Sequence, residues 1–137
     1  MTYRRDWGQP QVGPMGFEST MKTIGRVVTI NTADNVTGNT IGAFKVPAGF
    51  TVTGIFGSAT DMDSGAAMLI TIGDAGSANR YVTSLNTQAA VTSLTLAAAG
   101  LLFLNVTDTE ILITIATQAG TALAGTVTIY LVGFMAQ

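Results

Sequence analysis

Residues 41–65 read IGAFKVPAGFTVTGIFGSATDMDSG, and their turn residues and apolar alternation indicate the fold class of the chain. Pro47 presets the backbone of a turn and Gly49 suits the position after it, so the flanking segments 41–46 and 50–57 are predicted to form an antiparallel hairpin. The apolar residues after the turn share one parity, namely Phe50, Val52 and Phe56. This period-two pattern is typical of a strand with one buried face, and it indicates a β-sandwich.

Other short segments continue the same pattern along the chain. Strands are predicted over 21–31, 67–72, 80–83, 101–106, 110–117 and 125–135, with a short helix and then a strand within 84–99. Strands that recur about every ten residues, with no long helix, predict an all-β fold. We expect a single antiparallel β-sandwich, jelly-roll-like, over residues 21–137.

The composition points to association. The 137 residues suffice for one domain, and the absence of cysteine excludes disulfides and thiolate metal sites. Only 10% of the residues are charged, against about 25% in an ordinary soluble domain. A surface so poor in charge is weakly protected against self-association, so we predict a homo-oligomer, specifically a trimer.

Residues 1–20 differ from the rest and are predicted to form an extended N-terminal arm. They contain two of the three prolines and show no periodicity. Basic residues outnumber acidic ones over residues 1–30, whereas acidic residues outnumber basic ones over 31–137. This asymmetry favours an arm that docks on an acidic protein surface. Nucleic acid is not expected as a partner, because the acidic body would repel phosphate.

Two groups of residues are the predicted partner or oligomer interface. The arm supplies aromatic anchors beside positive charge, and the last strands supply apolar residues on the parity opposite to their core residues. The set comprises Tyr3, Arg4, Arg5, Trp7, Phe17, Leu112, Tyr130, Val132 and Phe134. The four residues from the last strands form one apolar patch if those strands are neighbours; alternatively, the strands are buried on both faces.

The sequence offers little for catalysis or metal binding. Without His or Cys, imidazole bases, thiol nucleophiles and most zinc sites are excluded. Asp61 and Asp63 resemble a glycosidase pair or the start of a calcium loop, but Asp-x-Asp-Ser-Gly is foremost a turn sequence. The segment 73–76 lacks the Lys-Ser/Thr of a phosphate loop. We expect no enzyme activity, no cofactor and no metal.

The sequence also suggests where the protein is made. The longest apolar run, over 94–104, is too short to span a bilayer, and the N-terminus shows no apolar secretory segment. We therefore expect no membrane association and synthesis in the cytoplasm of the producing cell.

Several stretches together resemble small structural proteins of tailed bacteriophages. They are VPAGFTVTG at 46–54, DMD at 61–63, GDAG at 73–76 with Arg80 and Tyr81, and the ending 119–133. The chain is most similar to capsid decoration, or cement, proteins of the jelly-roll type. The resemblance implies a virion protein on the capsid surface, commonly trimeric, that stabilises contacts between major capsid proteins. It assigns no individual site residues.

Two other functions stay open at this point. One is a carbohydrate-binding or adhesion β-sandwich of a phage tail or spike, which would expose several aromatics on one sheet face, and Tyr81 and Tyr130 are the two candidates for them. The other is a small glycosidase or lyase, which would need a carboxylate constellation that this sequence barely offers.

Overall fold

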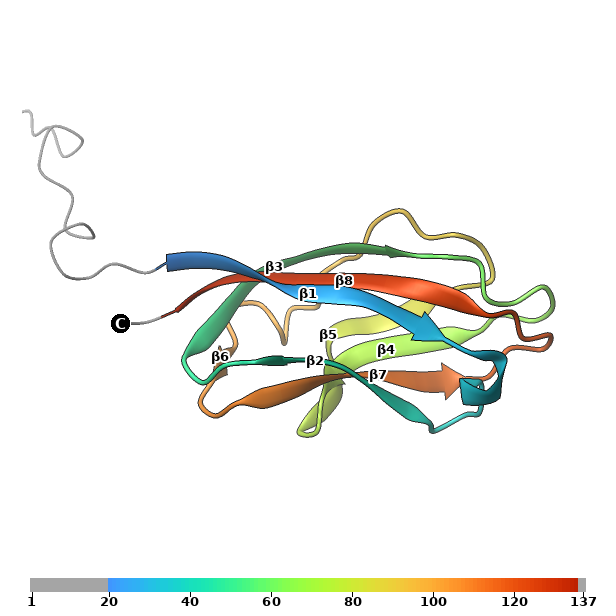
Figure 1. The fold of residues 1–137 in the computed structure, drawn as a ribbon, viewed down its shortest axis with the longest axis horizontal. Coiled ribbons are helices and arrows are strands. Elements are labelled where there is room, and N and C mark those ends of the chain that lie inside the picture. Colours follow the sequence, from blue (N-terminus) through green and yellow to red (C-terminus); the bar gives the residue numbers. More distant parts are fainter. Residues whose placement is uncertain (1–19, 136–137) are drawn as a thin grey trace, which may run out of the picture.

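Two four-stranded antiparallel sheets face each other across a common core in the computed structural model, which describes residues 20–135 (Figure 1). The strands are β1 (Thr20–Ile30), β2 (Thr40–Val46), β3 (Phe50–Ala59), β4 (Leu69–Asp74), β5 (Ser77–Asn86), β6 (Leu104–Asn105), β7 (Thr109–Thr117) and β8 (Gly125–Met135). A single 3₁₀ turn, Thr32–Asp34, is the only helical element among the described residues.

The strand order identifies the fold as a jelly roll. The first sheet has the order β1-β8-β3-β6 and the second β2-β7-β4-β5. The first strand pairs with the last, β2 with β7, β3 with β6 and β4 with β5. The chain is therefore one long antiparallel ribbon wrapped around its core, and its successive strand pairs lie alternately in the first and the second sheet. This confirms the predicted all-β jelly-roll-like sandwich.

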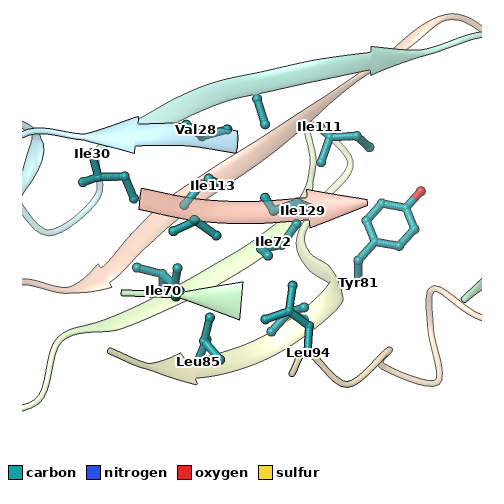
Figure 2. Close-up of a cluster of buried hydrophobic side chains, with 14 of the residues drawn as sticks. Val28, Ile30, Ile70, Ile72, Tyr81, Leu85, Leu94, Ile111, Ile113 and Ile129 are labelled. Carbon is teal, nitrogen blue, oxygen red and sulfur yellow. The ribbon is translucent and has the colours of Figure 1, made fainter. Parts of the chain in front are cut away.

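The core follows from the alternation of apolar and polar residues. In β7 and β8 every second residue is fully buried, and these residues meet the inward side chains of the facing sheet (Figure 2). The largest fully buried side chains are Ile30, Phe50, Met62, Met68, Ile70, Ile72, Tyr81, Ile111, Ile113, Ile115, Ile129 and Leu131.

The predicted hairpin over residues 41–57 is wrong. β2 lies in the second sheet and β3 in the first, so the two strands do not pair. The turn is real: Phe50 N–H donates to the Pro47 carbonyl at 3.3 Å, and Gly49 has a φ of +90°. Because Val46 and Phe50 are both fully buried, the chain crosses from one sheet to the other instead of folding back beside itself.

The segment 84–99 was also predicted incorrectly. It contains no helix, because β5 continues to Asn86, and its later strand is reduced to a bridge between Val91 and Ala59. Leu94 is buried and Leu96 is half-buried, so this long connection packs against the core without joining a sheet. The strand predicted over 101–106 is likewise reduced to Leu104–Asn105.

The two ends of the sandwich differ. We call one the arm end: there β1 begins, β8 ends, and the β2–β3, β4–β5 and β6–β7 connections lie (Figure 1). The opposite, far end carries the connections 31–39, 60–68 and 118–124. The predicted arm, residues 1–20, falls outside the described residues except for Thr20, which opens β1. Within residues 20–135, no helix has the length and apolar character to cross a membrane.

Candidate partner-binding surfaces

The outward side of the first sheet is apolar. Residues that pair across its strands point to the same side, and those opposite the core residues of β8 face outward. We call this surface the apolar face; its residues are Met21, Val27, Phe56, Tyr130, Val132 and Phe134. Met21 is 61% exposed, and Val27 and Phe56 are each 50% exposed. The rings of Phe56 and Tyr130 are stacked, with centroids 5.2 Å apart.

The structure separates the interface residues that the sequence grouped together. Tyr130, Val132 and Phe134 lie on the apolar face, each half-buried. Leu112 lies on β7, on the outer side of the second sheet, so it cannot join them in one patch. The strands of these two groups are not neighbours, because β7 and β8 belong to opposite sheets. The arm residues Tyr3, Arg4, Arg5, Trp7 and Phe17 lie outside the described residues.

The edge of the apolar face is protected against uncontrolled pairing. Lys22 and Arg26 share the inward parity of β1 but are exposed, which places two charges along the free edge of an eleven-residue strand. Charges that point inward at a sheet edge discourage another strand from adding there. Association through this sheet is therefore directed to its face.

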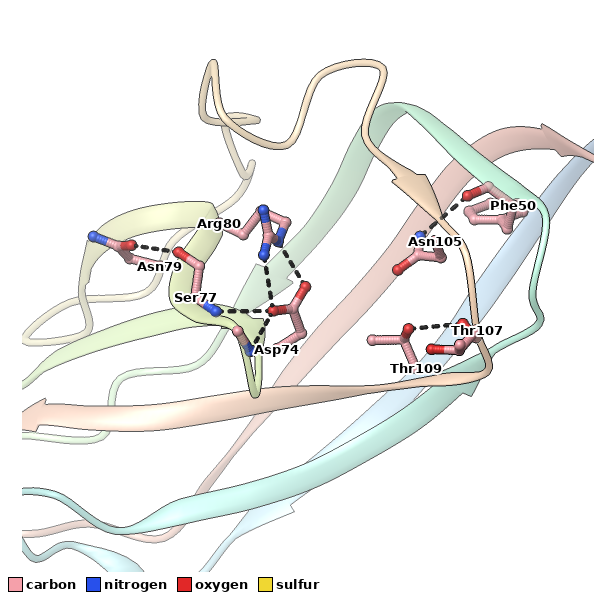
Figure 3. Close-up of polar contacts among 9 residues, drawn as sticks. Phe50, Asp74, Ser77, Asn79, Arg80, Asn105, Thr107 and Thr109 are labelled. Atoms are coloured by element: carbon pink, nitrogen blue, oxygen red, sulfur yellow. Dashed lines mark hydrogen bonds and ion pairs between the residues drawn. The ribbon is translucent and has the colours of Figure 1, made fainter.

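A pocket of about 370 Å³ opens at the arm end, between the β4–β5 turn and the chain from β6 to β7 (Figure 3). Its apolar lining comes from Phe103, Leu104, Val106 and Leu112. Its charged lining comes from Asp74, Arg80, Asp108 and Glu110. We call this the arm-end pocket.

Asp74 and Arg80 form the inner wall of this pocket. Arg80 Nε donates to Asp74 Oδ2 at 2.6 Å, and the guanidinium lies 3.7 Å from the ring centre of Phe103. Burial opposes ionisation of Asp74, but hydrogen bonds from Arg80 and from the N–H groups of Ser77 and Gly76 outweigh it and lower its pKa below 3.8. The same hydrogen bond to Asp74 raises the pKa of Arg80. Asp74 is thus an ionised carboxylate whose two oxygens both accept hydrogen bonds, and these bonds hold the β4–β5 turn in place.

Tyr81 lies behind the pocket and is fully buried, with its ring edge-on to Phe103. Burial raises the pKa of its hydroxyl, and the neighbouring Asn105 side chain offsets part of this. Among residues 20–135, neither the Tyr81 hydroxyl nor Asn105 Oδ1 has a hydrogen-bond partner. Because it is buried, Tyr81 cannot stack on a sugar, which removes one of the two aromatics considered for carbohydrate binding.

Asp63 is a structural carboxylate at the far end. Its Oδ1 accepts hydrogen bonds from the N–H groups of Gly65 at 2.7 Å and Thr121 at 3.1 Å, and its Oδ2 accepts one from Gly120 at 3.3 Å. Burial alone would raise its pKa, but these hydrogen bonds lower it below 3.8. Asp61 is exposed and accepts from the N–H of Asp63. Residues 20–135 contain no cluster of three or more His, Cys, Asp or Glu side chains that could hold a metal ion.

Sequence reasoning missed an exposed apolar stretch beside the pocket. Leu101, Leu102, Leu104 and Val106 are between 46% and 77% exposed, and we call them the apolar rim. Leu102 has a φ of +60°, a left-handed conformation that is costly for leucine, and its N–H donates to the Val52 carbonyl at 2.7 Å. The run of apolar residues was the available signal, but it predicts only a strand over 101–106 and not an exposed surface.

No protein-family model matches the chain, and the curated proteins contain no match. Among solved structures, the chain is similar to one described as "Cyanophage Pam1 capsid asymmetric unit", at 25% sequence identity and a TM-score of 0.69. The similarity covers 98% of this chain and 99% of the other. The two chains therefore correspond over nearly their full lengths, which confirms the resemblance to a capsid-associated phage protein.

Proposed function

We propose that this chain is a virion structural protein that decorates a phage capsid and stabilises it at contacts between major capsid proteins. The observation that carries the proposal is the similarity to a chain of a cyanophage capsid, which spans both chains almost completely. A match of that extent leaves no sizeable part of this chain outside the similarity.

The apolar face supports a role in assembly. Single exposed apolar residues are common, but this face sets several of them side by side on three adjacent strands, including the stacked rings of Phe56 and Tyr130. Low overall charge adds to the same effect, because few charged side chains interrupt such a surface. We assign the apolar face to contact with another capsid subunit or another copy of this chain.

We further propose that the free protein is a homotrimer. A cyclic trimer repeats one head-to-tail contact between successive copies, so the ring closes and leaves no open end. A trimer is also the state that the resemblance to decoration proteins implies. The arm residues Tyr3, Arg4, Arg5, Trp7 and Phe17 would extend the contact to neighbouring subunits, since aromatic and arginine side chains dominate binding energy at protein interfaces.

A catalytic role is not part of the proposal. The chain has no His or Cys, and the two buried carboxylates, Asp63 and Asp74, already accept hydrogen bonds at both oxygens. Such groups are held in place by the fold and are poorly suited to exchange protons with a substrate.

Binding to capsids tests the proposal. Purified full-length protein is mixed with capsids of the parent phage that lack it, and the capsids are sedimented. We expect saturable co-sedimentation, abolished by Val132→Asp on the apolar face and retained by Val36→Asp, an equally drastic change at the exposed far end. Binding to purified glycans without binding to capsids would contradict the proposal and favour an adhesion module.

A further inference from the structure

The arm-end pocket lies close to the point where residues 1–19 join the body. Thr20 pairs with Met135, and Met135 pairs in turn with Phe50. Phe50 pairs with Asn105, which lines the pocket. Since neighbouring strands are about 4.8 Å apart, Thr20 lies roughly 15 Å from the pocket wall.

The pocket combines apolar surface with two carboxylates, those of Asp108 and Glu110, that pair with no cation among residues 20–135. Arg80 neutralises Asp74, and this is the one ion pair that the described part of the chain contains. Asp108 accepts a hydrogen bond from the Ala48 N–H, and Glu110 stands opposite the exposed Lys45 in register without pairing to it. With Leu104 and Val106 on the same rim, the pocket suits a ligand that carries an aromatic ring next to positive charge.

The beginning of the chain has that chemistry. Residues 3–7 read Tyr-Arg-Arg-Asp-Trp, and Trp7 is the single tryptophan of the protein. Thirteen residues from Trp7 to Thr20 reach about 40 Å when extended, well beyond the distance to the pocket. A segment tethered so near has an effective concentration in the millimolar range, which favours it over a free ligand of equal affinity.

The geometry points to the arm-end pocket as a docking site for residues 3–7 of its own chain. The Trp7 ring packs on the apolar rim at Leu104 and Val106, and Arg4 and Arg5 pair with Asp108 and Glu110. Docked in this way, the aromatic residues of the arm are kept out of water until a partner displaces them. The inference concerns the free chain and does not depend on capsid binding.

Trp7 fluorescence in the full-length protein tests the inference. As the only tryptophan, it reports the arm without a label. We expect emission shifted to the blue, and acrylamide quenching slower than that of a free peptide of residues 1–20. Raising the salt concentration should move both readings toward the peptide values, because the arginine pairs lie at a solvent-exposed rim.

Variants localise the effect. Val106→Asp and Glu110→Lys should bring the quenching of Trp7 close to that of the free peptide, and both residues are exposed, so the fold should tolerate the changes. The matched controls at the far end, Val36→Asp and Asp61→Lys, should leave Trp7 as protected as in the unaltered chain. Thermal unfolding of all four variants verifies that each is folded.

Three results would overturn the inference. If acrylamide quenches Trp7 equally well in the full chain and in the free peptide, the arm is not docked. Unchanged protection in both pocket variants would place the arm elsewhere. Protection that disappears on dilution would assign the pocket to the arm of a second copy instead of its own.

Discussion

Two buried carboxylates fasten opposite ends of this sandwich. Asp63 joins two of the far-end connections, 60–68 and 118–124, by accepting hydrogen bonds from the backbone of each, and Asp74 closes the β4–β5 turn together with Arg80. A buried charge is tolerated only when it is paired or hydrogen-bonded, and both groups meet that condition. The chain has few charged residues, and these two stabilise the connections at the ends of the sandwich.

Replacing Asp63 by Asn tests this role. The amide would turn a donor toward N–H groups that now donate to the carboxylate, so at least one buried hydrogen bond is lost. We expect a clear decrease in melting temperature by circular dichroism, in contrast to Asp61→Asn, whose side chain is exposed and accepts a single hydrogen bond. Equal, small effects of the two substitutions would show that Asp63 is only a turn residue.

The pH dependence of stability follows from the same groups. The pKa values of Asp63 and Asp74 are lowered in the folded state from an ordinary value of 3.8. Their contribution is therefore complete above about pH 4 and lost as the pH falls through the lowered values. Urea unfolding between pH 7 and pH 2 should show a loss of stability confined to the acid side, with a shallower loss in Asp63→Asn. A midpoint that does not change with pH would contradict these assignments.

Leu102 offers a test of strain at the apolar rim. Its left-handed conformation costs leucine about 1–2 kcal/mol, which glycine avoids at an entropic cost of about 0.5–1 kcal/mol. Leu102→Gly should therefore leave the free energy of unfolding unchanged or slightly higher. Leu101→Gly, also exposed but without a positive φ, should lower it. Urea denaturation of both variants measures the two free energies of unfolding. A larger decrease for Leu102→Gly than for Leu101→Gly would mean that the Leu102 side chain makes stabilising contacts in the isolated protein.

At the scale of elements, the sequence predicts strands better than it predicts their partners. The alternation in β7 and β8 located both strands within one residue, because a half-buried strand must repeat every second residue. The Pro47–Gly49 turn was also located, but nothing in its residues says whether the next strand continues in the same sheet. That choice depends on the whole ribbon, which folds so that both Val46 and Phe50 reach the core.

The candidate surfaces were predictable to a similar extent. Parity alone put Tyr130, Val132 and Phe134 on the outer side of β8. It could not show that Phe56 lies beside them, or that Leu112 does not, because both facts depend on pairing between distant strands. The arm-end pocket is built from two segments far apart in sequence, 74–80 and 103–112, so local patterns carry no signal for it.

Gly25 tests the pairing of β1 with β8. A Cβ atom at this position would overlap the backbone carbonyl of Ile129, whereas one at Gly54, on the other side of β8, would meet only the Val132 side chain at 4.0 Å. Gly25→Ala should therefore be strongly destabilising and Gly54→Ala nearly neutral in urea unfolding. If Gly25→Ala and Gly54→Ala lower the free energy of unfolding by similar amounts, β1 and β8 are packed less closely than the structure indicates.

For the whole molecule, we have proposed that copies associate through the apolar face. Val132→Asp would bury a carboxylate without a partner, which costs several kcal/mol at an interface. We expect light scattering to show an oligomer for the unaltered protein, a monomer for Val132→Asp, and an oligomer for the far-end control Val36→Asp. A monomeric unaltered protein at micromolar concentration would contradict the proposed homotrimer.

We assign the chain to the capsid of a phage particle because of its similarity to a capsid chain. The most direct measurement is to separate particles from a lysate of infected cells into complete virions, isolated heads and isolated tails, and to quantify the chain in each by mass spectrometry. We predict that it sediments with virions and heads, in many copies per particle, and is absent from tails. Its presence in tails alone, or only among slowly sedimenting proteins, would contradict the account.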